Sequence, residues 1–505
     1  MAGQETANNR RETISEGIPG DSRTKIKLVG LMCTAFAILA ALIILTQTFV
    51  LLVALVSTLS LAGYLLIDLR RQKKKPHGKN SRIKGPFPIL FGLLVLPIAV
   101  AALYSLEEFN TRSIYSIVVA FGMTLTFMYS LINVPLTVYH KEFTSRLRPL
   151  YATPMITVII PAYNEEKSIR KTLDSVIEAD YPNKQVIVVD DGSTDNTLAI
   201  VHSYKSKFAP NSFVLISQPN RGKSAAINHA LRYAQGDYIM PIDADSIMAR
   251  ESMKEIMRYF QLPDVVAVGG NIKVKNRKSL LTCCQALEYI VGINLFKRAY
   301  DVFGVVMVVP GPLGAFKKKV LLERGEYDTD TLTEDFDTTL KALKSGRAVQ
   351  ASSSAMSFTE APETVKSLYK QRLRWNRGTL QTMIKHRDII SNSRFGMLQK
   401  YGYPLVFLTM LTLPFLSMVV AGFVILALFN GEWFFILVTL LVFVALEAVL
   451  SGIAVIMDEE DWKLVILSPL MVVGYKHLVD IFTIKSVFDV LIRKNLKWTS
   501  HKVPK

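Results

Sequence analysis

Two blocks of apolar sequence, one on each side of a more polar central segment, constrain the fold of this 505-residue chain most strongly. The first block covers residues 28–139 and the second covers residues 401–491. A transmembrane helix needs about 20 consecutive, mostly apolar residues. The first block has room for four such helices and the second for two or three, so we expect a domain inserted between α-helical transmembrane segments.

The distribution of the net charge of +17 indicates how these helices are oriented. Much of the positive charge flanks the apolar runs, as in the loop at 68–84 and at Lys141, Arg146 and Arg148. Lys and Arg beside membrane spans are typical of cytoplasmic loops. We therefore expect an integral protein of the plasma membrane, with its central domain in the cytoplasm. The same distribution argues against nucleic acid as the partner.

The two ends and the last apolar run complete this topology. Residues 1–27 are polar and lack a cleavage-site pattern, which predicts a disordered cytoplasmic tail. Residues 492–505 form a basic tail. The last apolar run, Leu464 to about Phe482, is short and contains three charged or titratable residues. If it crossed the bilayer, the basic tail would lie outside, so a re-entrant or interfacial helix is the alternative.

The central segment, residues 150–390, has the pattern of an α/β domain. Helical stretches follow the first three of four β-branched runs, which are Ile156–Pro161, Val186–Val189, Phe213–Ile216 and Tyr238–Ile242. This alternation predicts a Rossmann-like, mostly parallel sheet with helices on both faces. Ligands of such sheets bind at the carboxyl ends of the strands, where acidic residues occur in this chain.

Two acidic motifs follow predicted strands. Asp190 and Asp191 lie where a strand meets an Asp-Gly turn, so they could bind a ribose, a base or a metal, or only shape the turn. Asp243 and Asp245 follow the fourth strand. Two carboxylates one residue apart are the hard ligands that Mg²⁺ or Mn²⁺ needs while it also binds a diphosphate. This spacing is frequent by chance, so a structural role stays open for it.

A third acidic motif precedes a predicted helix at Phe336–Lys344. Thr333 is a good N-cap residue, and Glu334 and Asp335 in a first helical turn favour the helix dipole, so capping is one interpretation. The other is that Asp335 is a general base near an acceptor hydroxyl.

A fourth motif lies inside a predicted helix. Gln371, Arg374 and Trp375 are spaced i, i+3 and i+4, so they share one helix face. This face offers an amide, a guanidinium group for phosphate and an aromatic ring for a sugar. An amphipathic helix on the membrane surface would carry similar residues, and both interpretations can hold together.

Taken in order, these motifs resemble the family 2 glycosyltransferases, and among them the processive synthases of cellulose, chitin, hyaluronan and poly-N-acetylglucosamine. The shared motifs are PAYNEE at 161–166, VVDDGSTDNT at 188–197, NRGKSAAIN at 220–228, DADS at 243–246, GPLGAF at 311–316, TED at 333–335 and QRLRW at 371–375. The resemblance covers about residues 154–380. Each motif is weak alone, but the ordered set is specific.

The resemblance implies an inverting, metal-dependent transferase. It would move a sugar from a UDP-sugar to the non-reducing end of a growing β-linked polysaccharide, with export across the membrane. UDP-N-acetylglucosamine is the first expectation for the donor and UDP-glucose the second. The implied partners are the lipid bilayer, a polysaccharide or lipid-linked acceptor, and an accessory membrane subunit.

The resemblance also implies roles for residues on the donor side. Tyr163 and Glu165 would contact the uracil, and Asp191 the base or the ribose. Lys223 would lie near the diphosphate. The metal ion, Mg²⁺ or Mn²⁺, would be bound by Asp243 and Asp245, and Asp243 would also help to hold the nucleotide.

On the acceptor side, the resemblance makes Asp335 the base that deprotonates the attacking hydroxyl and its neighbour Glu334 a substrate-binding residue. The diphosphate and the acceptor sugar would be bound by Gln371, Arg374 and Trp375. The acceptor end would be lined by the residues of the GPLG motif, Gly311, Pro312, Leu313 and Gly314.

Three functions remain to be distinguished. GPLG resembles the hyaluronan synthases, whereas TED and the GAF ending resemble the poly-N-acetylglucosamine and cellulose synthases, so the product stays open. A non-processive transferase that adds one sugar to a membrane lipid is the alternative enzyme. A transporter or scaffold with a degenerate domain is a third possibility, against which the intact acidic residues argue.

Overall fold

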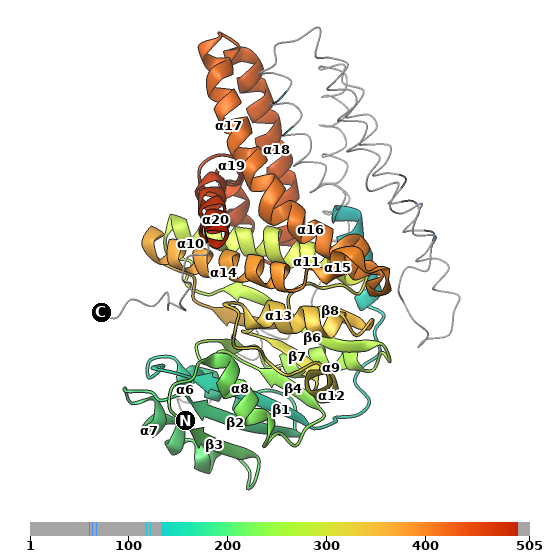
Figure 1. Ribbon diagram of the computed structural model, residues 1–505, viewed down its shortest axis with the longest axis vertical. Coiled ribbons are helices and arrows are strands. Elements are labelled where there is room, and N and C mark those ends of the chain that lie inside the picture. Colours follow the sequence, from blue (N-terminus) through green and yellow to red (C-terminus); the bar gives the residue numbers. More distant parts are fainter. Residues whose placement is uncertain are drawn as a thin grey trace, which may run out of the picture.

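The computed structural model of the chain describes residues 133–492 and five isolated positions before them, Ser60, Gly63, Ile67, Val118 and Gly122. The four spans expected within 28–139 therefore lie outside the described residues, apart from their last few positions, as do both tails. Figure 1 shows a sheet-containing domain at one end and the paired helices α17 (Leu413–Phe429) and α18 (Trp433–Met457) rising from it.

The domain is built on one eight-stranded sheet in the order β3-β2-β1-β4-β7-β6-β8-β5. The strands are β1 (Ile156–Ala162), β2 (Lys184–Asp190), β3 (Phe213–Ser217), β4 (Tyr238–Pro241), β5 (Ile247–Met248), β6 (Val265–Val274), β7 (Gly314–Lys317) and β8 (Ala348–Thr359). The strands β1 to β4 pair in parallel with one another, and β6 pairs in parallel with β8. The strand β7 is antiparallel to both β4 and β6, and β5 is antiparallel to β8. The predicted Rossmann-like α/β fold is confirmed, and its parallel half consists of the four predicted strands.

Helices cover both faces of this parallel half. The described helices of the domain are α6 (Ile169–Ile177), α7 (Thr197–Ser203), α8 (Lys223–Leu231), α9 (Ser252–Phe260), α10 (Leu280–Glu288), α11 (Phe296–Val302), α12 (Lys318–Glu323), α13 (Glu334–Leu343), α14 (Val365–Lys385) and α15 (Asp388–Ser391). Val158 and Ile160 of β1 share a hydrophobic cluster with residues of α6 and α7, whereas Ile159 shares another with residues of α8. Burial on both faces is typical of parallel strands.

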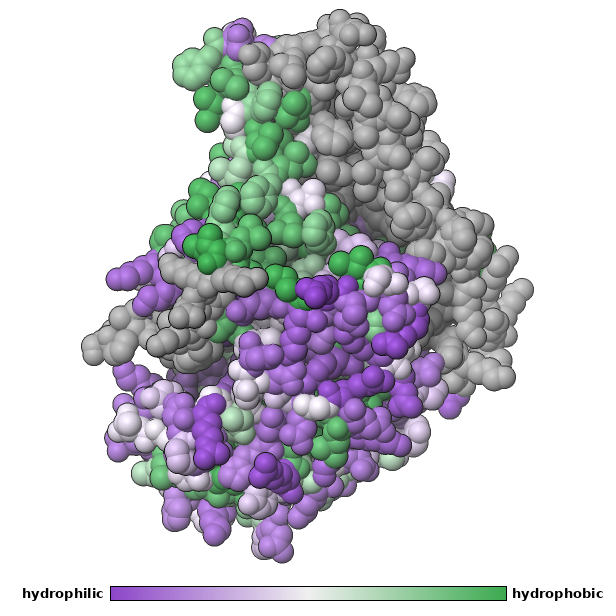
Figure 2. Space-filling model, in the orientation of Figure 1, coloured by the Kyte–Doolittle hydropathy of each residue, from purple (hydrophilic) through white to green (hydrophobic). Residues whose placement is uncertain are grey.

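A layer of helices separates the sheet from α17 and α18. Figure 1 shows α10, α11 and α14 in this layer. Between α10 and α11 lies a π-helical segment, Tyr289–Leu295. The surface of the sheet domain is mostly hydrophilic, whereas apolar residues gather over α17 and α18 (Figure 2).

Two helical segments among the described residues are long and apolar enough to cross a membrane, Leu398–Phe429 and Ile436–Met457. Leu398–Phe429 includes α16 (Tyr403–Phe407) and α17. The third apolar run is broken: Trp462–Val472 and Tyr475–Leu491 meet at an angle of 56°. Gly474 lies in the break with φ +101°, a conformation that glycine adopts at little cost. The two parts contain α19 (Ser468–Val472) and α20 (Tyr475–Leu491).

A buried polar network joins the end of α18 to β6 and to the helix layer that contains α11. Asp458, the C-cap of α18, is fully buried and forms an ion pair with Arg298 of α11. Its carboxylate also accepts hydrogen bonds from Asn294 Nδ2 at 3.0 Å and Asn271 Nδ2 at 3.3 Å. Lys273 Nζ donates to the main-chain oxygen of Asp458 at 2.8 Å. The apolar helix is therefore fixed to β6 and α11 by groups that have no access to water.

Removing the charge of Asp458 should destabilise the protein strongly. In Asp458→Asn, the Arg298 guanidinium stays buried without a counter-charge, and breaking a buried ion pair costs about 3–5 kcal/mol. We expect a loss of this size in the free energy of unfolding, measured by denaturant titration in detergent micelles. Glu323→Gln, which breaks the exposed pair with Lys319, is the control and should change it little. A loss in Asp458→Asn no larger than in the control would contradict this account.

Candidate active site

The acidic motifs converge at the carboxyl ends of the parallel strands. Asp191 follows β2, Asp243 and Asp245 follow β4, and Lys223 begins α8 after β3. Because β1, β2, β3 and β4 are parallel neighbours, their ends meet at one edge of the sheet. The start of α13 reaches this edge from the other half of the domain, as the contacts of Glu334 show.

A lysine joins two of these acidic residues. Lys223 Nζ lies 2.5 Å from Asp243 Oδ1 and 2.6 Å from Glu334 Oε1. The side chains of Lys223, Asp243 and Glu334 are 30%, 27% and 12% exposed, so a ligand can reach the group. Gly311 packs directly against it, because a Cβ atom there would lie 2.8 Å from Lys223 Nζ and 3.0 Å from Asp243 Oδ2. Three residues from three segments of the chain therefore form one charged cluster, and Gly311 from a fourth segment packs against it.

The charged groups in this cluster shift one another's pKa values. Burial raises the pKa of Asp243, and the carboxylates of Asp245 and Glu334 raise it further, against the opposing charge of Lys223. Burial also acts to raise the pKa of Glu334, but the charge and hydrogen bond of Lys223 outweigh it and the pKa is lowered. For Lys223, burial lowers the pKa, yet Asp243 and Glu334 raise it more. Lys223 is therefore held as a cation and Glu334 as an anion.

Asp335 lies beside this cluster in the first turn of α13. Its Oδ1 accepts a hydrogen bond from the Phe336 N–H at 2.8 Å. Burial raises the pKa of Asp335 to about 6, the Glu334 carboxylate adds to the rise, and Lys223 opposes it. A carboxyl group with such a pKa is ionised at neutral pH and still basic enough to take a proton. The capping interpretation of Thr333 is wrong in one respect, since its side chain makes no hydrogen bond at the helix start.

A threonine hydroxyl connects Asp335 to the segment before GPLG. Thr339 Oγ1 donates to the main-chain oxygen of Asp335 at 2.6 Å and accepts from the Val309 N–H at 2.9 Å. This bridge fixes the segment that ends at Gly311 against the first turn of α13.

The GPLG residues do not share one environment. Gly311 touches the charged cluster, and Pro312 is half-buried beside it. Leu313 is fully buried and packs against Gly270, and Gly314 begins β7 inside the sheet. The last two residues therefore support the segment. Gly311 is itself buried against the charged cluster, and Pro312 is the partly exposed residue of the four.

The predicted donor-side residues occupy two neighbouring loops. The Asp191 carboxylate accepts hydrogen bonds from Gln218 Nε2 at 2.7 Å and from the N–H groups of Arg221 and Gly222 at 2.9 and 2.8 Å. It thereby fixes the loop that leads into Lys223. Its Oδ2 atom accepts one of these three bonds, and the residue is buried.

The loop after β1 holds the other two donor-side residues. Tyr163 is 42% exposed and open to a ligand. Glu165 accepts a hydrogen bond from Ser168 at the start of α6, and its N–H donates to Thr197 Oγ1 at 2.8 Å. Glu165 therefore also shapes the contact between this loop and the one after β2.

The face of α14 that is predicted to bind substrate lies close to the start of α13, where Glu334 and Asp335 lie. A Cβ at Gly378 would lie 2.6 Å from Thr333 Cγ2, so α14 packs tightly on the start of α13. The charge of Arg374 contributes to lowering the pKa of Glu334. Gln371 is buried, and its Oε1 atom has no hydrogen-bond partner among the described residues. The Trp375 ring lies 6.3 Å from that of Tyr289.

The metal expectation depends on two carboxylates. Within residues 133–492, no three His, Cys, Asp or Glu side chains come together as a metal site. Asp243 and Asp245 act on each other electrostatically and supply two hard oxygen donors. This donor set fits Mg²⁺ or Mn²⁺ only when a bound diphosphate adds further oxygens.

Sequence reasoning missed three residues near this site. Tyr327 is buried, its hydroxyl has no hydrogen-bond partner among the described residues, and the charges of Lys223 and Glu334 act on it. Tyr289 packs near Trp375 from a π-helical segment that has no signal in the sequence. Gly378 did have a signal, because glycine inside a helix costs about 1 kcal/mol relative to alanine and implies close packing.

Comparisons with known proteins bear on the same residues. Residues 157–323 match the model of the family described as "Glycosyl transferase family 2". The chain is 34% identical over 241 residues to the poly-beta-1,6-N-acetyl-D-glucosamine synthase of Staphylococcus aureus (strain COL), which is 47% of this chain and 57% of that protein. It is 32% identical over 248 residues to the synthase of the same description from Staphylococcus epidermidis, which is 49% of this chain and 59% of that protein. The matched part thus spans less than two thirds of these relatives.

A solved structure supports the fold. A mannosyltransferase of Pyrobaculum calidifontis, in complex with GDP-Man and Mn²⁺, aligns with a TM-score of 0.53 and 20% identity. The alignment covers 76% of this chain and all of that one. Residues 157–323 therefore match the model of the family 2 glycosyltransferases, and this part of the chain is similar to part of two synthases.

Proposed function

We propose that this protein transfers N-acetylglucosamine from UDP-N-acetylglucosamine to the non-reducing end of a growing β-linked polysaccharide. The observation that carries the proposal is the Lys223–Asp243–Glu334 cluster, whose charges act on the neighbouring Asp335, a carboxyl group with a pKa of about 6. The names of the staphylococcal relatives support N-acetylglucosamine as the sugar, ahead of glucose.

In this proposal the donor lies over the carboxyl ends of β1, β2 and β4. Tyr163 packs on the uracil from its exposed position, and Asp191 contacts the nucleoside. Lys223 and Arg374 bring positive charge to the diphosphate. Asp243 and Asp245 would hold Mg²⁺ or Mn²⁺, which when bound would neutralise charge on the departing diphosphate. The Mn²⁺ in the Pyrobaculum complex supports this choice.

Asp335 takes the proton from the acceptor hydroxyl as that oxygen attacks the anomeric carbon in line with the leaving diphosphate, which inverts the configuration. Its position is suited to this role because the Phe336 N–H holds one oxygen and leaves the other for the acceptor. The Trp375 ring packs on the acceptor sugar. The buried Gln371 amide provides an oxygen, Oε1, that accepts no hydrogen bond from any described residue. Gly311 lets the substrate approach the cluster closely.

The membrane part of the proposal depends on the apolar helices. We place the catalytic domain in the cytoplasm, at a bilayer crossed by Leu398–Phe429 and Ile436–Met457, because positive charge flanks the apolar runs. Export of the product and an accessory subunit belong to the same proposal. The second candidate is transfer of a single sugar to a lipid. One observation favours it: α14, which carries the predicted substrate face, packs on α20 of the third apolar run, so a lipid acceptor among the apolar helices would lie near that face.

Product size separates the two candidates. Vesicles that contain the purified protein would receive labelled UDP-N-acetylglucosamine or UDP-glucose with Mg²⁺ or Mn²⁺. The proposal predicts a high-molecular-weight product that a β-N-acetylglucosaminidase degrades. A single lipid-soluble glycoside would support the second candidate, and the absence of product from every UDP-sugar would contradict both.

Removing the base tests the mechanism. Asp335→Asn keeps the size of the side chain but cannot take a proton, and general base catalysis contributes about 10²–10⁴-fold. We expect kcat to fall by a factor in this range, with UDP affinity changed by less than about threefold. Initial rates and titration calorimetry measure the two quantities. Glu178→Gln, at an exposed position after α6, is the matched control and should behave as the wild type. Retention of kcat in Asp335→Asn would exclude this residue as the base.

The raised pKa of Asp335 predicts the pH dependence of the reaction. The ionised form is the base, so the active fraction is complete above the pKa and falls as the pH drops through it. We expect kcat at saturating donor to lose about tenfold per unit below an apparent pKa of about 6. Rates measured between about pH 5 and 8 give this value. A kcat that stays constant down to about pH 5, as an ordinary aspartate pKa of about 3.9 would give, would show that the burial of Asp335 does not persist in the enzyme–substrate complex.

A further inference from the structure

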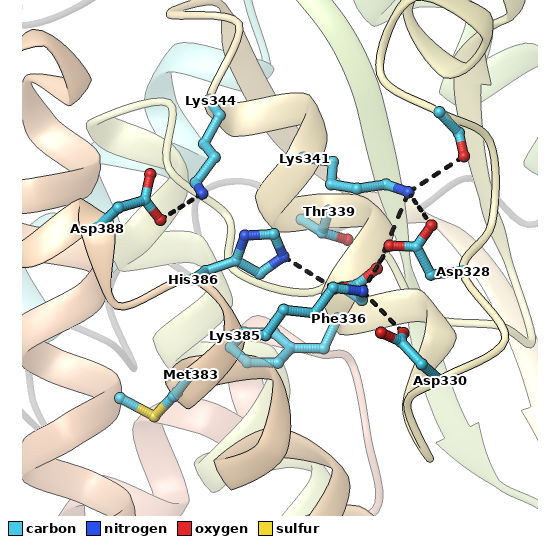
Figure 3. Close-up of polar contacts among 12 residues, drawn as sticks. Asp328, Asp330, Phe336, Thr339, Lys341, Lys344, Met383, Lys385, His386 and Asp388 are labelled. Carbon is cyan, nitrogen blue, oxygen red and sulfur yellow. Dashed lines mark hydrogen bonds and ion pairs between the residues drawn. The ribbon is translucent and has the colours of Figure 1, made fainter.

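A second acidic residue of α13 makes contacts unlike those of Asp335. Asp337 lies in the same first turn, and its side chain is completely buried. Its Oδ1 lies 2.8 Å from His386 Nε2 and 3.2 Å from Lys385 Nζ. These two residues end α14, the helix that carries the predicted substrate face. Figure 3 shows His386 and Lys385 meeting α13 at this point.

This contact suits both helix ends. Negative charge is favourable at the start of a helix, and positive charge is favourable at the end. Asp337 meets the first condition for α13, and Lys385 meets the second for α14. The pair therefore stabilises both ends and fixes one against the other.

The neighbouring charges hold Lys385 in place. Lys385 Nζ also lies 2.5 Å from Asp328 and 2.8 Å from Asp330, and Lys341 Nζ lies 2.9 Å from Asp328 (Figure 3). Lys341 is 4.0 Å from Asp337 Oδ2, which accepts no hydrogen bond from any described residue. The completely buried carboxylate of Asp337 is therefore contacted at Oδ1 by His386 Nε2 and Lys385 Nζ, and the histidine contact is the shorter of the two.

The consequence for the active site follows from the other contacts of the two helices. Gly378, seven residues before Lys385, packs on Thr333, the residue that begins the TED motif. Thr339 ties the main chain of Asp335 to Val309. The start of α13 is therefore held at Val309, at Gly378 and at the end of α14. Of these contacts, the one at Asp337 fixes the C-terminal end of α14. It thereby fixes the position, relative to α13, of the helix face that carries Gln371 and Trp375.

We propose that Asp337 is a positioning residue for transfer: through His386 it holds α14 against α13, so that the acceptor bound on the α14 face meets Asp335 at reacting distance. The inference rests on the proposed role of Asp335 as the base. Asp337 itself touches neither substrate nor metal.

The test compares variants at both ends of the contact. A displacement of about 1 Å can lower a rate by about 10²-fold, so Asp337→Asn and His386→Ala should each lower kcat by about ten- to a hundredfold. The KM for UDP-N-acetylglucosamine should change by less than about threefold, because the donor cluster is untouched. The acid limb of kcat should stay near the wild-type pH, since Asp335 remains the base. His386→Gln keeps an N–H group at a similar reach and should recover part of the rate.

Two further variants distinguish positioning from general destabilisation. The double variant Asp337→Asn/His386→Ala should lose no more than the worse single variant, because residues that act through one contact are not additive. Asp388→Asn is the matched control: it breaks the half-exposed pair of Asp388 with Lys344, which also joins α13 to a following helix, and kcat should not change. Rates are normalised to folded protein, measured as monodisperse protein that binds UDP.

The outcomes separate this inference from the proposed function. If Asp335→Asn is inactive and Asp337→Asn has wild-type kcat, the positioning role is wrong and the base assignment stands. If Asp335→Asn stays active, the proposed mechanism itself fails. Losses that multiply in the double variant, or a raised KM with unchanged kcat, also overturn the positioning role. If Asp337→Asn does not fold, the comparison of His386→Ala with His386→Gln decides the question, since both keep Asp337 paired with Lys385.

Discussion

The Lys223 ammonium between two carboxylates is the interaction on which the site depends. Asp243, Asp245, Glu334 and Asp335 come from two halves of the domain, and four carboxylates so close together would repel one another. Lys223 bonds to Asp243 and Glu334 directly, which lowers the pKa of Glu334 and leaves that of Asp335 raised. Neighbouring carboxyl groups with pKa values pushed apart are typical of acid–base sites. One cation thus both assembles the cluster and gives its members different protonation behaviour.

The fold supplies the rest of this arrangement through α14. At one end this helix meets Asp337, in its middle it packs on Thr333, and along its outer side it bonds to α20. The contacts with α20 include an ion pair between Arg377 and Asp489 and a 2.9 Å hydrogen bond from Asn376 Nδ2 to Thr483 Oγ1. Because α14 is held on both sides, the residues on it have little freedom to move. The face of α14, the start of α13 and α20 are therefore joined by direct contacts.

The sequence predicted the parts of this fold that are local. The strands β1 to β4 were found because β-branched runs alternate with helices, and their carboxyl ends placed the acidic motifs together. The other four strands were not predicted, because β6 and β8 pair across some 80 residues and their register depends on contacts far along the chain. From the sequence, one of the three C-terminal apolar runs was expected to be re-entrant or interfacial, and the third run bends by 56° at a break that contains Gly474. In the site, Asp337 and Tyr327 carried no signal, since their importance depends on partners distant in the sequence.

The most direct test is the structure of the enzyme with UDP-N-acetylglucosamine and Mn²⁺, determined by electron microscopy in lipid nanodiscs. The account predicts the diphosphate between Lys223 and Arg374, with the free oxygen of Asp335 within about 3–3.5 Å of the acceptor hydroxyl. The account would be contradicted by a donor bound away from this cluster, for example in the open cavity of about 550 Å³ between α6 and α7 that Arg170 and Asn196 line.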